Sequence, residues 1–459
     1  MPVRYESVTA NPEPLARPLT FPFSNKTAKN RLLKSAMAEN LATWSGTDPS
    51  RRGIPTPELV EIYRRPSSWG EGPNSFGVIV TGNMDVEFDY MTSVGDMIVT
   101  PECEPVGERF EGFRAVAAAG KAHGSLMLPQ ITHAGRQVKK KIQPSPISAS
   151  AIQLGPKMGM EFGAPREATK ADIERVVEGF AHAAEYLEKA GFDGIQVHAA
   201  HGYLVSQFLS RTTNQRADEY GTQTLENRTR LIAEIGRAVR ARTSPGLILS
   251  AKLNSVEFQD GGVTPDEARE LCGQLSELGF DFPEISGGTY EDVGFDWVRD
   301  STRQREGFFL EFADTVVKGL GDDAGARRTK AYIVGGMRSV GAMVKALDVV
   351  DGVSLARPAA HEFRIASDIL EGRISGAVRP VDMLEADFGF EMAAAGANMR
   401  LVSKGREPFD VSDPAAVQVF AGDVQAWYGD IVADGDRLEH HGAADFSGET
   451  RPYDATAAA

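Results

Sequence analysis

Eight short apolar runs, each of the length of a β-strand, alternate with helical segments along most of the chain. The runs lie at 31–37, 76–82, 125–130, 194–197, 247–252, 280–286, 331–334 and 352–355. Strands that alternate with helices form parallel sheets, because each helix returns the chain to the start of the next strand. Eight repeats predict an α/β fold in which the sheet closes into a (β/α)8 TIM barrel. A doubly wound open sheet is the alternative that the same alternation allows.

Two of the helices between these runs have recognisable ends in the sequence. Thr169 with Asp172, and Thr264 with Glu267, have the spacing of a capping box, in which the two side chains satisfy backbone N–H groups of the first turn. Gly191 follows the first of these helices, and glycine commonly ends a helix because it adopts a left-handed conformation without strain. Both helices are therefore predicted with defined starts.

The pattern divides the chain into three parts. Residues 1–29 are rich in proline and polar residues and predict an N-terminal lead-in. Residues 30–380 contain the eight repeats and predict the barrel. Residues 381–459 predict a C-terminal helical extension and tail, with helical patterns near 383–404 and 417–427 and an alanine-rich end.

Composition excludes several classes of function. The net charge of -15 argues against nucleic-acid binding, because an acidic surface repels phosphates. Two cysteines, Cys103 and Cys272, are too few for a disulfide framework or a cysteine-ligated cluster. The N-terminus lacks the apolar core of a signal peptide, and no apolar run approaches the roughly 18 residues of a membrane span. We expect a cytoplasmic protein that binds neither nucleic acid nor a membrane. It can be a homo-oligomer.

Three polar residues with reactive side chains stand at the end of the fourth apolar run. His198, His201 and Tyr203 fall within six residues, where the strand pattern stops. Active sites of barrels collect at the carboxyl ends of the strands, so this cluster is the candidate catalytic site. One alternative is that the two histidines are structural residues of the core or of a loop, with Tyr203 as a packing aromatic. The other is that the histidines bind a metal ion. No third ligand of matching spacing supports a metal.

The residues that follow the other apolar runs suggest a flat, phosphorylated ligand. Runs seven and eight are followed by Gly335-Gly336 and by Arg357, at the place where this fold usually binds phosphate. The alternatives are that the glycines only end a strand and that Arg357 is a surface cation. Gln130 offers both a donor and an acceptor, and Lys252 is either a counter-charge for an anion or a lysine that reaches solvent. The candidate cofactor-binding residues are Ala36, Met37, Gly82, Gln130, Lys252, Gly335, Gly336, Ala356 and Arg357.

Several ordered motifs resemble the Old Yellow Enzyme family of FMN-dependent oxidoreductases. The longest is HAAHGYLVSQFLS at 198–210, followed by Asn214, Arg216, Asp218, Glu219, Tyr220, Gly221, Leu225, Glu226, Asn227 and Arg228. The supporting motifs are NRLLKSAM at 30–37, QITHAGRQ at 130–137, PREAT at 165–169, ISGGTYE at 285–291, VGGMRS at 334–339 and DGVSLARP at 351–358. The resemblance extends over roughly residues 15 to 400.

The resemblance implies that residues 30–380 form an FMN-binding barrel that uses NADH or NADPH as reductant. Ala36, Met37, Gly82 and Gln130 would contact the flavin ring, with Lys252 near its pyrimidine edge. The phosphate would be held by Gly335, Gly336, Ala356 and Arg357. The implied substrate is a small molecule with an activated C=C bond, such as an α,β-unsaturated carbonyl compound. His198 and His201 would bind its oxygen, and Tyr203 would protonate the α-carbon as hydride reaches the β-carbon.

The chain departs from the family pattern in two places, and other functions stay open. Ala38 stands where many members have threonine or cysteine, and Lys252 where arginine is common. No cysteine follows Cys272 and no G-x-G-x-x-G occurs, so we expect neither the iron–sulfur cluster nor the second nucleotide domain of larger relatives. The alternatives are an FMN enzyme for demethylation or catabolism of a small hydrophobic or amine compound, a flavin-binding barrel without turnover, and a histidine-ligated metal hydrolase.

Overall fold

The computed structural model describes residues 2–5, 10–64, 74–157, 159–255, 257, 262–287, 313–321, 326–435 and 437–453. Parts of the predicted lead-in, the last four residues of the ISGGTYE motif and the alanine-rich end lie outside these residues. In the described chain no helix is long and apolar enough to cross a membrane.

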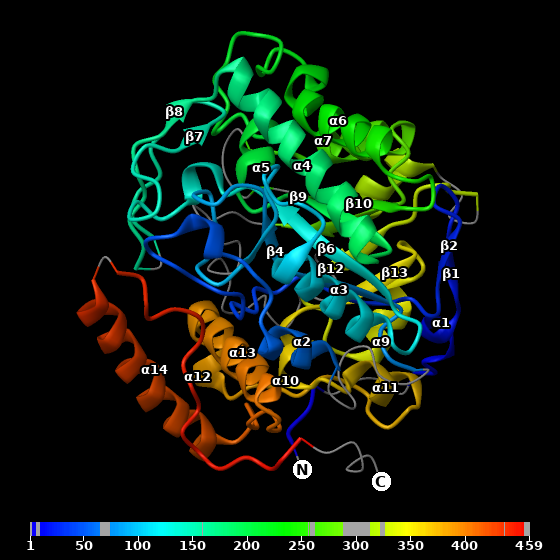
Figure 1. Ribbon diagram of the computed structural model, residues 1–459. Helices are drawn as coiled ribbons and strands as arrows, with labels where there is room; N and C mark the ends of the chain where they lie inside the picture. The colour runs from blue at the N-terminus through cyan, green and yellow to red at the C-terminus, as the bar shows by residue number, and fades with distance from the viewer. Residues whose placement is uncertain are drawn as a thin grey trace.

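A closed barrel of eight parallel strands forms the centre of the molecule (Figure 1). The barrel strands are β3 (Leu32–Lys34), β4 (Val78–Asp85), β6 (Leu126–Thr132), β9 (Gly194–Ala199), β10 (Ile248–Asn254), β11 (Phe282–Ser286), β12 (Tyr332–Val334) and β13 (Gly352–Leu355). Neighbours pair in the order β3-β13-β12-β11-β10-β9-β6-β4, and the β3–β4 pairing closes the ring. The predicted TIM barrel is confirmed, and the open sheet is wrong.

The first strand is shorter than predicted. β3 ends at Lys34, although the sequence pattern continued to Met37. The amide of Ser35 still donates to the Leu355 carbonyl at 2.9 Å, after which the chain leaves the sheet. Ala36 and Met37 are therefore half-buried residues of the loop after β3.

Helices surround the barrel between the strands, as the alternation predicts (Figure 1). They are α2 (Pro57–Arg64), α3 (Gly107–Lys121), α4 (Lys170–Ala190), α5 (Leu204–Leu209), α6 (Leu225–Arg242), α7 (Pro265–Glu277), α9 (Val340–Ala346), α10 (Arg357–His361) and α11 (Ile365–Leu370). Both predicted capping boxes are present, at Thr169 and at Thr264. Gly191 ends α4 with a left-handed φ of 99°, a conformation that favours glycine.

Short elements complete the barrel wall and its loops. They are β5 (Met97–Ile98), β7 (Ile147–Ser148), β8 (Arg166–Glu167) and the 3-10 turns at Pro49–Arg51, Gly135–Gln137 and Lys318–Leu320. β5 pairs with the carboxyl end of β4, and β7 pairs with β8 outside the barrel.

The lead-in closes the amino-terminal end of the barrel. It contains α1 (Glu13–Ala16) and a hairpin of β1 (Leu19–Phe21) and β2 (Lys26–Ala28). Phe21 is fully buried and stacks on Phe282, the first residue of β11, with ring centroids 5.1 Å apart. Because this end is sealed by apolar packing, a ligand has to reach the barrel from the opposite end, where the strands finish.

The C-terminal extension packs beside the barrel and has an apolar cluster of its own. It comprises α12 (Asp382–Glu385), α13 (Phe388–Ser403) and α14 (Pro414–Asp434), and α14 lies at the periphery in Figure 1. The predicted helix at 383–404 is divided because Asp387 caps a new helix through the Phe390 amide. Phe409 and Phe420 pack together between α13 and α14, with ring centroids 5.0 Å apart.

Candidate active site at the carboxyl ends of the strands

The strand register brings polar side chains of neighbouring strands to one level of the barrel. His198 in β9 is the register partner of Lys252 in β10, and Lys252 is the partner of Glu284 in β11. On the other side of β9, Gln196 pairs with Gln130 of β6. Four strands therefore contribute to one polar group near the barrel mouth.

The predicted catalytic trio is assembled as a compact aromatic cluster. The His198 ring lies 5.2 Å from the His201 ring and 4.7 Å from the Tyr203 ring, and it is nearly perpendicular to both. Tyr203 is buried and occupies the N-cap of α5, so its position is fixed by the start of that helix. The three side chains can therefore contact one small molecule.

The backbone at His201 is held in an unusual conformation. Its φ is 59°, in the left-handed region that residues other than glycine adopt at a cost of about 1–3 kcal/mol. Gln137 Nε2 donates to the His201 carbonyl at 3.1 Å, and the His201 amide donates to Asn254 Oδ1 at 3.4 Å. Its ring Nε2 lies 3.0 Å from Ser286 Oγ. Residues from three other strand ends thus fix the direction of this imidazole.

Both histidines are neutral at ordinary pH. Burial, together with His201 and Lys252, holds the pKa of His198 well below its usual value. Burial and Lys252 lower the pKa of His201 to about 3. The Ala200 amide donates to His198 Nδ1 at 3.3 Å, so the ring proton of His198 is on Nε2. His198 can therefore donate one hydrogen bond to a ligand without carrying a charge.

A buried chain of polar side chains runs beneath this cluster. Gln130 Nε2 donates to Gln196 Oε1 at 2.6 Å, and Gln196 Nε2 donates to Glu284 Oε2 at 3.1 Å. Lys252 Nζ lies 3.5 Å from the same carboxylate oxygen and donates to Ser35 Oγ at 2.9 Å. Because the Gln130 side-chain NH2 group donates to Gln196, its carbonyl oxygen is the group that can accept a hydrogen bond from a ligand. The network fixes Lys252 and Gln130 in place.

Gly82 leaves no room for a side chain. A Cβ there would lie 2.1 Å from Glu39 Oε2 and 2.5 Å from the Met37 carbonyl oxygen. The Gly82 amide donates to Glu39 Oε1 at 2.8 Å, and the hydroxyl of Tyr63 donates to the same oxygen. Glu39 thus connects the loop after β3 to β4. Because Glu39 fills the space beside position 82, only glycine fits there.

Replacing Gly82 by Ala is expected to lower the free energy of unfolding by about 1–3 kcal/mol, because Glu39 or the Met37 backbone has to move. We also expect the purified variant to retain less FMN, since Met37 is a predicted flavin contact. Thermal unfolding and the flavin-to-protein ratio measure the two effects. Gly155→Ala is the control, because nothing lies within 4 Å of its Cβ position. Equal stability of the two variants would contradict this prediction.

The residues predicted to hold phosphate meet where β12 and β13 end. Gly335 and Gly336 have φ values of 110° and 72°, so this turn requires glycine. Ala356 has an uncommon backbone conformation, with φ -104° and ψ -100°, at the start of α10. The Arg357 guanidinium is paired with Glu391 of α13 and lies 4.9 Å from the centre of the Phe388 ring. Arg357 is thus held in part by the C-terminal extension.

Several residues that shape the site were missed by sequence reasoning. They are Glu39, which positions the loop after β3, and Gln137, Asn254 and Ser286, which position His201. Each acts through a partner far away in the chain. Gln137 and Ser286 lie within the family motifs, which was the one available indication. In the described part of the chain, no group of three His, Cys, Asp or Glu side chains is placed to hold a metal ion.

A buried carboxyl pair lies beside the loop after β3. Thr92 donates through its amide to Asp85, at 3.3 Å, and through its hydroxyl to Asp96, at 2.5 Å. Asn40 Nδ2 donates to Asp96 at 3.2 Å. Burial raises the pKa of Asp96 to about 7, and burial with the neighbouring Asp96 raises the pKa of Asp85.

The Asp96 carboxyl predicts a loss of stability as the pH rises. In the unfolded chain an aspartate has a pKa of about 3.9, so between about pH 4 and pH 7 the folded protein binds more protons. Stability is then lost as the pH rises through this window, by on the order of 1–3 kcal/mol. Asp96→Asn should reduce this loss in urea unfolding at pH 5 and pH 8. The same change at the exposed Asp382 should not, and an unchanged profile for Asp96→Asn would refute the assignment.

Comparisons with known proteins show the family of this chain and agree with its fold. The model of the NADH:flavin oxidoreductase / NADH oxidase family matches residues 15–319. NADH-dependent flavin oxidoreductase nadA of Aspergillus parasiticus is 44% identical over 420 residues, which cover 91% of this chain and 92% of that protein. The solved complex of 2-naphthoyl-CoA reductase with 2-naphthoyl-CoA has a TM-score of 0.67 at 24% identity, over 83% of this chain and 59% of that one. Morphinone reductase in complex with tetrahydroNAD has a TM-score of 0.61 at 21% identity, over 80% and 93% of the two chains.

Proposed function

Because this chain belongs to the NADH:flavin oxidoreductase / NADH oxidase family, and is an FMN oxidoreductase of the Old Yellow Enzyme type, we propose that it reduces activated C=C bonds. The proposed substrates are small α,β-unsaturated carbonyl compounds, and the reductant is NAD(P)H. In the balanced reaction the β-carbon gains a hydride and the α-carbon gains a proton, while NAD(P)H is oxidised to NAD(P)⁺. The relative from Aspergillus parasiticus is named as NADH-dependent, which favours NADH.

The residues at the barrel mouth fit FMN. Gln130 presents a fixed carbonyl oxygen to an N–H of the flavin ring, and the Lys252 ammonium supplies positive charge at the same edge. Gly82, packed against Glu39 and the Met37 carbonyl, would hold the loop after β3 beside the flavin ring. The positive φ values of Gly335 and Gly336 would let the backbone of this turn approach a phosphate closely. We propose that Ala36, Met37 and Ala356 complete the contacts, with Arg357 near the phosphate. The hydride comes from FMN when it is bound and has been reduced by NAD(P)H.

The neutral histidine pair is the observation that carries the proposal. A pair of uncharged N–H donors binds an oxygen weakly in the ground state and more strongly as negative charge develops on it, which favours the transition state. His198 can donate from Nε2, and His201 is aimed by Ser286 and by its restrained backbone. Lys252, the register partner of His198 on the next strand, adds positive potential. The pair therefore suits a substrate oxygen that becomes enolate-like.

Tyr203 is the proposed proton donor. Its ring packs against His198 at 4.7 Å, so its hydroxyl and the histidine pair face the same small ligand. A phenol is a suitable general acid for a carbon that is becoming basic, because it is protonated at neutral pH. Since Tyr203 is the N-cap of α5, the start of this helix fixes the backbone from which the proton donor extends.

Anaerobic turnover with a panel of oxidants tests the substrate class. Cyclohexenone and related enones should be reduced by NADH, with one saturated product formed per NADH consumed. Saturated ketones and tertiary amines of similar size are the controls. Reduction of the bound FMN by the amines in the absence of NADH, with no NADH consumed in the presence of the enones, would reject the ene-reductase proposal and favour a demethylating oxidoreductase.

A further inference from the structure

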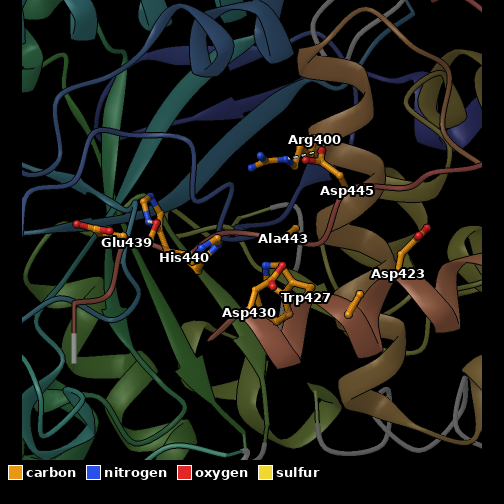
Figure 2. A pocket seen from close by; sticks show the side chains of 10 residues that line it. Arg400, Asp423, Trp427, Asp430, Glu439, His440, Ala443 and Asp445 are labelled. Atoms are coloured by element: carbon orange, nitrogen blue, oxygen red, sulfur yellow. Dashed lines mark hydrogen bonds and ion pairs between the residues drawn. The ribbon is translucent and has the colours of Figure 1, made fainter. Parts of the chain in front are cut away.

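A pocket of about 500 Å³ lies between the C-terminal extension and its last described segment. Trp427 and Asp430 enter it from α14 and Arg400 enters it from α13, while Glu439 and His440 come from the segment that follows α14 (Figure 2). None of these residues belongs to the site described above.

The pocket adjoins the barrel mouth through the loop after β3. A Cβ on Gly442 would lie 3.3 Å from the Asn40 carbonyl oxygen, so the C-terminal segment touches this loop directly. Asn40 is three residues after Met37, a distance of at most about 11 Å along the chain. Glu39, between them, binds Gly82. The segment that lines the pocket therefore contacts the loop that carries Met37 and Glu39.

A second connection runs through the loop after β6. His441 lines the pocket, and burial lowers its pKa, with smaller contributions from Arg400 and Lys139. Lys139 is two residues after Gln137, which donates to the His201 carbonyl. Lys141 donates to the Gly435 carbonyl at the end of α14. The loop after β6 thus contacts both the His201 backbone and the end of α14.

The pocket combines an aromatic surface with hydrogen-bond acceptors. Trp427 offers a flat indole for stacking, and the carboxylates of Asp430 and Glu439 accept hydrogen bonds from hydroxyl or amino groups. The positive charge of Arg400 is offset by Asp445, at 2.7 Å. Asp423 also lines the pocket, so the lining has a net negative charge when the histidines are left out of the count. This chemistry suits a neutral purine nucleoside and opposes a phosphate group.

We propose that this pocket binds the adenosine half of NADH while the nicotinamide reaches the barrel mouth, so that the C-terminal extension determines the preference for NADH over NADPH. The proposal rests on the proposed function, since it assigns the second end of the same reductant. The adenine stacks on Trp427, and the ribose hydroxyls donate to Asp430 or Glu439, as acidic residues do for the 2′-hydroxyl in other dinucleotide sites. The diphosphate passes Lys139. A 2′-phosphate would meet the carboxylates and be repelled.

Anaerobic reduction of the FMN-loaded enzyme, followed at several reductant concentrations, tests the site. Trp427→Ala should raise the NADH concentration for half-maximal reduction by at least about fivefold, the loss expected for one stacked base, and leave the limiting rate unchanged. The wild type should require about tenfold more NADPH than NADH, and Asp430→Asn with Glu439→Gln should reduce this ratio. N-benzyl-1,4-dihydronicotinamide, which lacks adenosine and diphosphate, should reduce all variants equally well.

Two variants outside the pocket serve as matched controls. Val432→Ala truncates an exposed apolar side chain of α14, and Glu449→Gln removes an exposed carboxylate of the same C-terminal segment. Both should behave as the wild type with NADH. The proposal is overturned if Trp427→Ala leaves half-saturation by NADH unchanged, if the truncated reductant is affected to the same extent, or if only the half-saturation by the enone rises. Failure of both reductants to reduce the wild-type flavin would instead reject the proposed function.

Discussion

Tyr203→Phe is expected to slow the reoxidation of the reduced enzyme by cyclohexenone by about a hundredfold or more, while reduction by NADH keeps its rate. Loss of a general acid costs about 10²–10⁴ in the step that it serves, and only the second half-reaction needs a proton at carbon. The phenylalanine ring keeps the packing against His198, so the cluster should stay assembled. Stopped-flow absorbance of the flavin measures each half-reaction separately.

Tyr220→Phe is the matched control for this change. It removes the Tyr220 hydroxyl, which donates to Glu234 of α6, from a residue of the same family motif as the trio. The control should reoxidise at the wild-type rate. If Tyr203→Phe also reoxidises at that rate, the tyrosine is a packing residue and another group donates the proton.

Replacing both His198 and His201 by Ala should weaken the binding of a phenol, which mimics an enolate, and slow enone reduction. We expect each lost donor to reduce phenol affinity about tenfold or more, since a hydrogen bond to a charged group contributes about 1.5–3 kcal/mol. The reoxidation rate should fall by about 10²–10³, as for the loss of an oxyanion-binding donor. Spectral titration with the phenol and stopped-flow reoxidation are the measurements.

The left-handed backbone at His201 calls for a second variant that separates strain from function. Alanine there carries a conformational penalty, whereas asparagine tolerates a positive φ and keeps one N–H donor. His201→Asn should therefore fold normally and bind phenol more tightly than the double variant. His182→Ala, on α4, is the control, because this ring contacts the Cys103 carbonyl outside the site. Wild-type phenol binding by the double variant would mean that the histidines are structural.

The barrel could be predicted because its information is local. Apolar runs, capping boxes and the glycine after α4 each act over a few residues, so the alternation of strands and helices was readable along the chain. The trio was readable for the same reason, since its three members fall within six residues. Their roles stay predictions, although the structure brings their rings together.

The parts that could not be predicted depend on contacts between distant residues. Glu39 connects Met37 to Gly82 across two strands, and Arg357 pairs with Glu391, 34 residues further on. The C-terminal helices were predicted from the spacing of their apolar residues, but the contact of Gly442 with the Asn40 carbonyl was not predicted. Such contacts arise only when the barrel is closed, and they leave no periodicity in the sequence.

The visible spectrum of the purified protein under anaerobic conditions tests the central claim most directly. Our account predicts a yellow protein that loses its colour with NADH and regains it when cyclohexenone is added. This sequence would demonstrate flavin binding, reduction by the nicotinamide and transfer to an activated double bond in one sample. A colourless protein that takes up no added FMN would contradict the account, and colour lost with NADH but not restored by the enone would reject the substrate class.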